Sequence, residues 1–216
     1  MKIYLSIDFD FWVKPRDPIN LAEIGRYSDS GEGWILRYLH YDIEKWKISG
    51  IPTPFTLFDM LKKRLNFNIN EIYVTDSHKE AYHFFKNKDS QALIIHLDSH
   101  SDQEPTSKLY CGNWISFLSN PILWIYPEWV YPNHFYYDKN RTKVSTLRNL
   151  NVKGTITDIF ICRSGGWVPP HLDSYFFKFA KKIERLGKTI YNNINKREFN
   201  LKKITEERKK WIQNYI

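Results

Sequence analysis

One short segment constrains the fold and the chemistry of this chain more than any other. The apolar run Ala92–Leu97 is rich in β-branched residues and is typical of a strand buried within a sheet. It leads directly into DSHSD, which supplies Asp98, His100 and Asp102. In extended chain, residues at i, i+2 and i+4 point to one side, so two carboxylates and an imidazole face a common point. Unneutralised carboxylates repel each other and resist burial. The segment therefore indicates a divalent cation at the end of a buried strand.

Two other predicted strands end in the same kinds of side chain. Lys2–Phe9 is predicted as a buried strand that ends in acids, and Glu71–Thr75 is a shorter strand followed by a histidine. Ligands of open α/β sheets bind outside the carboxyl ends of the strands, so we expect these groups to converge. The predicted metal ligands are Asp8, Asp10, His78, Asp98, His100 and Asp102.

The donor types suggest the number and the kind of metal ions. Four carboxylates are too many for one four-coordinate Zn²⁺ site, and they suit two ions that share bridging carboxylates. An oxygen-rich set with some imidazole favours Mn²⁺, with Zn²⁺, Fe²⁺ or Co²⁺ as alternatives. The expected cofactor is therefore a pair of Mn²⁺ ions.

Strands alternate with predicted helices along the chain, which predicts an α/β three-layer sandwich with a mainly parallel sheet. We expect a single domain over residues 1–216, with a basic helical segment at about 196–216. Further strands are expected at Pro121–Tyr126 and Thr157–Cys162. Helices are expected at Trp34–Trp46, Phe55–Leu65, Lys79–Phe85, Gly112–Leu118, Leu172–Leu186 and Lys202–Tyr215, and long irregular segments at Val13–Gly33 and Trp124–Tyr137.

The composition of the chain excludes several classes of protein. With 42% hydrophobic and 17% aromatic residues the chain is neither disordered nor a coiled coil, and no apolar run reaches the ~20 residues of a membrane span. Two cysteines, Cys111 and Cys162, make no disulfide framework, so a reducing, cytoplasmic location without membrane association is expected. The sequence lacks the Gly-x-Ser-x-Gly elbow of serine hydrolases and the P-loop lysine.

The net charge is concentrated at one end of the chain. Lys178–Ile216 carries 12 basic and 4 acidic residues, and so accounts for the whole net charge of +8. A solvated helix face is the simplest explanation of such a charge run. Nucleic-acid binding without catalysis is a less favoured alternative, because most aromatic residues lie upstream of the basic segment.

The three strand-end motifs together resemble those of the arginase (ureohydrolase) superfamily. DSHSD resembles the Asp-Ala-His-x-Asp signature, and SIDFD, from Ser6 to Asp10, is similar to the Ser-x-Asp-x-Asp signature. The segment ending at His78 resembles the one that supplies the first histidine ligand. The Ser-x-Asp-x-Asp strand comes last in ordinary arginases and first here, which is the order of a circular permutation. Together with the CGNW segment, Cys111–Trp114, this order resembles a group of small, permuted arginase-like proteins that includes peptide arginases.

The resemblance implies which residues hold each ion. Asp8 and Asp98 would bridge the two ions, with His78 and Asp102 completing the first site and Asp10 and His100 the second. It also implies hydrolysis of the guanidinium group of arginine to ornithine and urea by a hydroxide that bridges the metals, with Asp98 and Asp102 as catalytic groups. The substrate would be an arginine-containing peptide, more specifically a ribosomally made precursor, or a small guanidino compound.

Two departures from the arginase pattern leave the substrate contacts open. Val13, Lys14 and Pro15 stand where arginases carry Asp-Pro, and Cys111-Gly112 replaces a His-Gly. The candidate substrate contacts are Glu32, Cys111, Gly112 and Asn113. A different amidine or amide C–N hydrolase or a deacetylase on the same fold is the nearest alternative. A haloacid-dehalogenase-type phosphatase explains the first motif but leaves the Asp98–Asp102 cluster unexplained.

Overall fold

The computed structural model describes residues 1–14, 34, 37–38, 43–194 and 196–215. Most of the loop expected at Val13–Gly33 and part of the helix expected at Trp34–Trp46 lie outside the described residues. Glu32, a candidate substrate contact, lies outside them as well.

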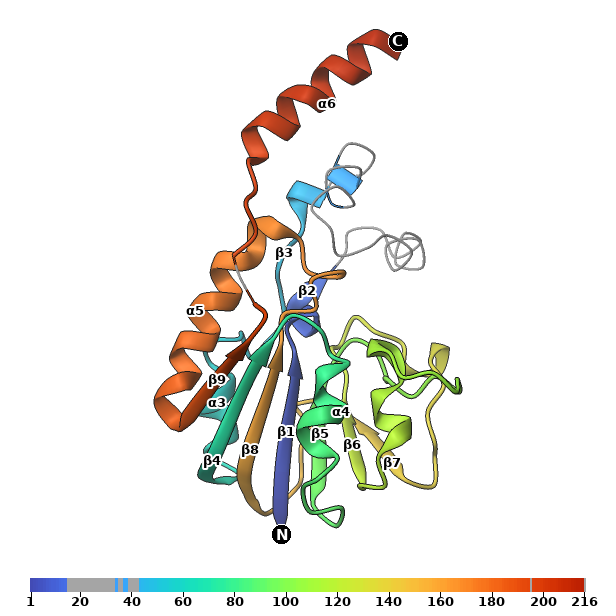
Figure 1. Ribbon diagram of the computed structural model, residues 1–216, viewed down its shortest axis with the longest axis vertical. Helices are drawn as coiled ribbons and strands as arrows, with labels where there is room; N and C mark the ends of the chain where they lie inside the picture. The colour runs from blue at the N-terminus through green and yellow to red at the C-terminus, as the bar shows by residue number, and fades with distance from the viewer. Residues whose placement is uncertain (15–33, 35–36, 39–42, 195, 216) are drawn as a thin grey trace.

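A sheet of seven parallel strands forms the centre of the molecule (Figure 1). Its spatial order is β7-β6-β5-β1-β8-β4-β9. The strands are β1 Lys2–Asp8, β4 Asn66–Thr75, β5 Leu93–Leu97, β6 Ile122–Ile125, β7 Thr142–Ser145, β8 Thr155–Cys162 and β9 Lys188–Asn192. Two short strands, β2 Val13–Lys14 and β3 Lys47–Ile48, pair separately and antiparallel. The α/β architecture with a parallel sheet confirms the predicted fold class.

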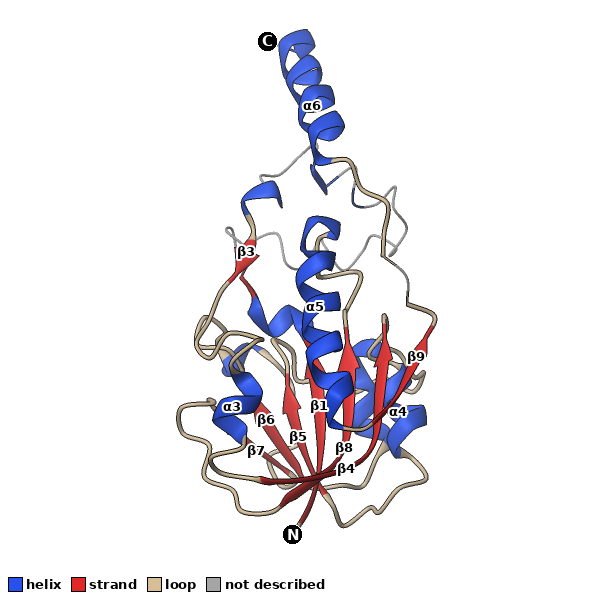
Figure 2. Ribbon diagram, turned by 90° about the vertical axis from the view of Figure 1, so that its left-hand side faces the viewer, coloured by secondary structure: helices blue, strands red, loops and turns tan. Residues whose placement is uncertain are grey.

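Helices cover both faces of the sheet, which makes three layers (Figure 2). One face carries α3 Leu57–Leu61 and α5 Asp173–Ile183, and the other carries α4 Glu80–Phe85 and the 3₁₀ helix η4 Cys111–Phe117. Among the described residues the structure also contains the helices η1 Phe9–Trp12, η3 Ile43–Lys45, η5 Pro132–His134, η6 Pro170–Leu172, η7 Glu184–Leu186 and α6 Leu201–Tyr215. Within the described part of the chain, none of the helices combines the length and the apolar character of a membrane span.

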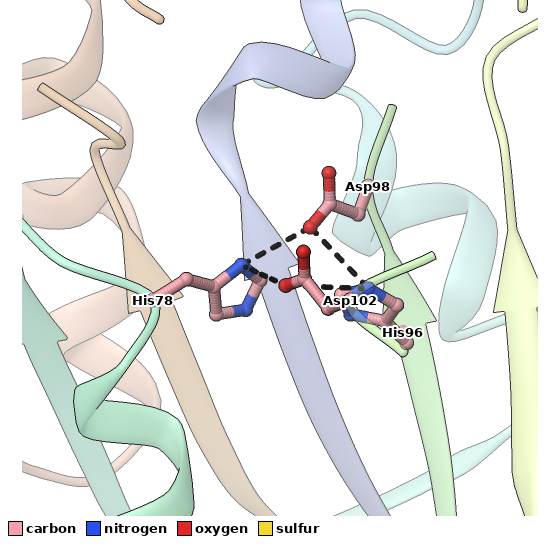
Figure 3. Close-up of side chains that lie close together, drawn as sticks. All are labelled: His78, His96, Asp98 and Asp102. Carbon is pink, nitrogen blue, oxygen red and sulfur yellow. Dashed lines mark ion pairs between the residues drawn. The ribbon is translucent and has the colours of Figure 1, made fainter. Parts of the chain in front are cut away.

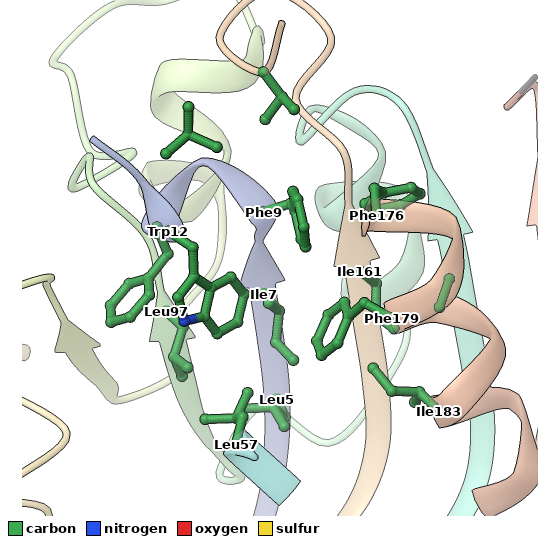
Figure 4. Close-up of a cluster of buried hydrophobic side chains, with 14 of the residues drawn as sticks. Leu5, Ile7, Phe9, Trp12, Leu57, Leu97, Ile161, Phe176, Phe179 and Ile183 are labelled. Atoms are coloured by element: carbon green, nitrogen blue, oxygen red, sulfur yellow. The ribbon is translucent and has the colours of Figure 1, made fainter. Parts of the chain in front are cut away.

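The alternation of side chains along the strands builds two cores. In β1, Ile3, Leu5 and Ile7 pack toward α3 and α5, while Tyr4 packs on the α4 side. We call the core between the sheet and the helices α3 and α5 the first core. It contains the aromatic cluster around Phe9 and Trp12 that Figure 4 shows. Because side chains alternate along a strand, Ser6 and Asp8 at the carboxyl end of β1 lie on the same face as Tyr4, which is the α4 side of the sheet. The register places Ser6 opposite His96 of β5.

The structure differs from the expected elements at the edges of the sheet. The strands β7 and β9 were not predicted from the sequence, because these outermost strands pair on one side only and their polar composition hides the strand pattern. The stretch expected to be irregular from Trp124 to Tyr137 begins inside β6. The helix expected at Gly112–Leu118 is the 3₁₀ helix η4, and the one expected to reach Leu186 leaves α-helical geometry after Ile183.

The basic C-terminal segment forms α6, which extends away from the sheet (Figure 1). Its attachment to the body includes Ile204, which is buried against the first core, and an ion pair between Arg208 and Glu44 at 3.1 Å. The expected C-terminal helix is therefore present.

Candidate metal centre

The carboxyl ends of β1, β4 and β5 bring the six predicted ligands to one edge of the sheet. Asp8 ends β1, His78 follows β4, and Asp98 follows β5. The strand order makes β1 and β5 direct neighbours and separates β1 from β4 by β8 alone. Asp10 in η1, and His100 and Asp102 beyond β5, lie within the same cluster. Figure 3 shows four of the side chains of this cluster pointing toward one another.

His78 lies at the centre of the first group of donors. Its Nδ1 is 3.1 Å from Asp8 Oδ2, 3.1 Å from Asp98 Oδ2 and 3.1 Å from Asp102 Oδ2. One imidazole nitrogen carries at most one proton, so it cannot satisfy three carboxylates by hydrogen bonding. Donor atoms around an octahedral ion with bonds of about 2.1 Å are about 3.0 Å apart. The spacing therefore fits a metal site, and this buried His/Asp group could hold a metal ion.

His100 lies in a second group, which shares Asp98 with the first. Its Nδ1 is 3.1 Å from Asp10 Oδ2 and 3.3 Å from Asp98 Oδ1. The two oxygens of Asp98 thus face the two different groups. Asp8 was expected to bridge in the same way, but its Oδ1 accepts a hydrogen bond from the backbone N–H of Asp10 at 3.0 Å. Among the contacts of the described residues, only Asp98 reaches both groups through two different oxygens.

His96, which was not predicted as a ligand from the sequence, contributes to the first group. His96 is fully buried in β5, and its Nε2 lies 3.3 Å from Asp98 Oδ2 and 3.8 Å from Asp102 Oδ2 (Figure 3). Neither ring nitrogen has a hydrogen-bond partner among the described residues. The signal that could have found it is the same alternation that identified Asp98 and His100, continued one step back into the strand. Burial lowers the pKa of His96 to about 3, which keeps the ring in the neutral form that binds metals.

Burial and neighbouring carboxylates raise the pKa of Asp8 and Asp98, whereas neighbouring histidines outweigh burial and lower the pKa of Asp10 and Asp102. Burial, with the charge of Asp10, raises the pKa of Asp8 to about 6. Burial and three neighbouring carboxylates, those of Asp102, Asp10 and Asp8, raise the pKa of Asp98 well above its usual range. A cation that replaced the protons would remove this electrostatic conflict.

The pKa values of two histidines, His78 and His100, shift in the opposite sense to what burial alone would cause. Burial lowers the pKa of His78, but the neighbouring carboxylates, with Asp102 first, outweigh it and raise the pKa well above its ordinary value. Burial likewise lowers the pKa of His100, and Asp10 and Asp98 raise it by more. In the absence of metal, protons on these imidazoles supply the positive charge that the carboxylates require.

Neighbouring polar groups fix the orientation of the donors. Ser6 Oγ lies 2.8 Å from His78 Nε2, which leaves Nδ1 of that ring directed at the carboxylates. Ser99 Oγ donates to Asp10 Oδ2 at 2.8 Å, and the His100 backbone N–H donates to Asp98 Oδ1 at 2.8 Å. Outer partners of this kind orient ligands and raise metal affinity.

Asp76, two residues before His78, is a structural residue. Its carboxylate accepts two hydrogen bonds at 2.7 Å from the guanidinium of Arg163, which also donates to Asp173 at 2.9 Å. Asp76 does not cap the following helix, because Lys79 is the N-cap of α4 and the cap has no side-chain hydrogen bond. The buried ion pairs instead hold the segment after β8 against the end of β4.

The cluster is open to solvent on the His100 side. The His100 side chain is 23% exposed, whereas those of the other six members are 5% exposed or less. Two half-buried aromatic rings flank it, Trp167 at 4.5 Å and Phe135 at 5.7 Å between ring centroids. A substrate would therefore reach the cluster past His100.

The predicted substrate contacts in the CGNW segment differ in how far they are exposed to solvent. Cys111 is exposed and Gly112 is half-buried at the start of η4. Asn113 is fully buried, and its amide accepts from the Tyr110 backbone N–H and donates to Thr106 and Lys108. With both ends of its amide engaged in these hydrogen bonds, Asn113 supports the loop, and its contact with a substrate stays a prediction.

Comparison with family models, with curated proteins and with solved structures finds no match to this chain. The interpretation of the cluster therefore depends on its geometry and on the chemistry of its donors.

Proposed function

We propose that this protein is a hydrolase that uses two divalent cations, most simply Mn²⁺, to cleave the guanidinium group of arginine. The observation that carries the proposal is the position of Asp98, whose two oxygens face two separate groups of donors, each with an imidazole. Asp8, His78, Asp98 and Asp102 would hold one ion, and Asp10, Asp98 and His100 the other. The motifs that resemble those of arginases support arginine as the substrate.

Two divalent ions held by these residues would lower the pKa of a bound water toward neutrality. In the proposed reaction, Asp102 orients the attacking water. Asp98 contacts both donor groups and so fixes their positions relative to each other. Water adds its oxygen to the guanidinium carbon, the bond from that carbon to the side-chain nitrogen breaks, and both protons of the water pass to the departing nitrogen. The products are neutral urea and ornithine with a protonated side-chain amine, so that atoms and charge balance.

The surface near His100 supports a peptide as the form of the substrate. Tyr131 and Tyr136 are 73% and 57% exposed. Their segment is fixed to the site, because Ser101 Oγ donates to the carbonyl of Tyr136 at 2.6 Å. Exposed aromatic side chains are common in protein interfaces, and these would contact residues on either side of a substrate arginine.

Hydrolysis is tested by incubating the Mn²⁺-loaded protein with free arginine and with arginine-containing peptides. We expect a mass loss of about 42 Da for each arginine converted, together with urea. Peptides with lysine or citrulline in place of arginine are the controls and should be unchanged. If metal is bound and neither arginine nor any peptide loses this mass, the proposed function is wrong.

One observation favours the alternative of an amide C–N hydrolase with a single ion. His78, His96, Asp98 and Asp102 offer two imidazoles and two carboxylates within 4.8 Å of one another. That mixture suits one tetrahedral ion such as Zn²⁺. Binding of one equivalent of metal, with hydrolysis of acylated amines and no reaction with arginine, would favour this alternative.

Metal binding should become tighter as the pH rises. The pKa values of Asp98, His78 and His100 lie above their ordinary values, so the metal-free cluster retains protons that an ion must displace. We expect the affinity for Mn²⁺ to increase between pH 6 and pH 8 and protons to be released on binding. Titration calorimetry in two buffers with different ionisation enthalpies measures this release, and an affinity that does not change with pH would contradict the account.

A further inference from the structure

We infer that Trp114 is a positioning residue of the metal site, which holds the carboxylate of Asp102 and the ring of His78 in place. Its indole Nε1–H donates to Asp102 Oδ2 at 2.6 Å. The same oxygen lies 3.1 Å from His78 Nδ1 and 3.8 Å from His96 Nε2. An indole N–H is always a donor, so it can orient a carboxylate toward a cation without competing for the cation itself.

The backbone of Asp102 needs such support. Its φ of +52° lies in the left-handed region, which residues other than glycine adopt infrequently and which persists only where the surroundings impose it. The N–H of Ile115 donates to the carbonyl of Asp102 at 3.2 Å. The 3₁₀ helix η4 thus holds Asp102 twice, by its backbone through Ile115 and by its carboxylate through Trp114.

Trp114 is itself fixed by the aromatic layer beneath the cluster. It is fully buried, and its ring lies against His78 with centroids 5.2 Å apart and planes 32° apart. The edge of His96 meets it at 5.5 Å and 82°, and Phe85 stacks on it at 5.9 Å and 27°. One side chain therefore sets the positions of three members of the first donor group.

The variant Trp114→Phe keeps an aromatic ring and removes the N–H donor. Titration of the full chain with MnCl₂ should show affinity for the ion weakened by about 10- to 100-fold, the effect typical of losing an outer partner of a metal ligand. Trp46→Phe is the control, because Trp46 is buried in the core on the other face of the sheet. It should bind MnCl₂ like the wild type, with any change confined to stability.

Nuclear magnetic resonance of the metal-free protein tests the hydrogen bond between Trp114 and Asp102 itself. If Trp114 only filled space, the indole N–H signal would not depend on Asp102. Among the indole N–H signals of the eight tryptophans, that of Trp114, assigned through the proximity of its ring to His78 and Phe85, should be shifted downfield, and it should move upfield in Asp102→Ala. This measurement uses the wild type and one other variant, so it remains decisive if Trp114→Phe fails to fold.

The outcomes separate this inference from the proposed function, on which it depends only for metal binding. If Trp114→Phe binds MnCl₂ as tightly as the wild type, or if the indole signal does not respond to Asp102→Ala, the positioning role is wrong while arginine hydrolysis stands. If the wild type binds MnCl₂ and Trp114→Phe binds it weakly, but arginine is not hydrolysed, the positioning role stands and the proposed function fails. A wild type that binds no MnCl₂ overturns both.

Discussion

Asp98→Asn is expected to abolish metal binding and yet to stabilise the metal-free protein. Asparagine keeps the shape of the side chain but lacks the charge needed to hold two cations, so the affinity for Mn²⁺ should fall by more than about 100-fold and hydrolysis of arginine should be lost. The metal-free wild type, in contrast, buries Asp98 among three other carboxylates. Removing this repulsion should raise the free energy of unfolding at pH 7 by roughly 1–3 kcal/mol.

The sign of the stability effect follows from the direction of the pKa shift. The pKa of Asp98 is raised in the folded state, so the wild type loses stability as the pH rises from the unfolded pKa through the folded one. The advantage of Asp98→Asn should therefore be largest near neutral pH and should vanish below about pH 4. Thermal unfolding in the presence of a chelator, measured from pH 4 to pH 8, tests this dependence.

Asp158→Asn is the matched control, because it should differ from Asp98→Asn in its effects on both stability and Mn²⁺ binding. Asp158 is also a buried acid, but it lies in the amino-terminal half of β8 and pairs with Lys88 at 2.8 Å. Its replacement should lower stability and leave Mn²⁺ binding unchanged. If Asp98→Asn retains metal, or if it destabilises the metal-free chain as Asp158→Asn does, Asp98 is not the shared ligand.

Mn²⁺ itself is expected to produce a large rise in the melting temperature of the wild type. An ion at a free concentration of 100 times its Kd stabilises the folded state by about 2.7 kcal/mol, and two ions by about twice that. For a chain of this size the melting temperature should rise by about 10–20 °C. A chelator should reverse the change, as measured by thermal unfolding followed by circular dichroism.

Comparison with Asp98→Asn shows whether this stabilisation comes from the cluster. Without metal, Asp98→Asn should melt above the wild type, and with saturating Mn²⁺ it should melt well below it. A rise of less than about 2 °C in the wild type, or an equal rise in both proteins, would mean that no strong site exists at Asp98.

The buried centre of the fold could be predicted from the sequence because its strands are apolar on both faces. β1, β5 and β8 each contain three consecutive large apolar residues, Ile3–Leu5, Leu93–Ile95 and Ile159–Ile161, as is typical of a central parallel strand. The edge strands β7 and β9 lack this signal, since solvent can satisfy one side of their backbone and polar residues are tolerated there. Periodicity therefore identifies the middle of the sheet better than its margins.

The donors of the cluster could be predicted where they follow a strand, and not where they lie inside one or far along the chain. Asp98 and His100 stand out because acids and imidazoles are unusual directly after a buried strand. His96 was hidden within an apolar run, although its alternation with Asp98 pointed to the same face. Trp114 could not be identified in this way, because its contact with Asp102 depends on how η4 packs on the sheet.

A crystal structure of the protein grown with Mn²⁺, with anomalous diffraction used to locate the ions, tests the two-ion site directly. We expect two peaks roughly 3.5 Å apart on either side of the Asp98 carboxylate, one beside His78 and the other beside His100. One peak alone, bounded by His78 and His96, would contradict the two-ion site and favour the single-ion alternative. The absence of any peak at these side chains would contradict the metal centre as a whole.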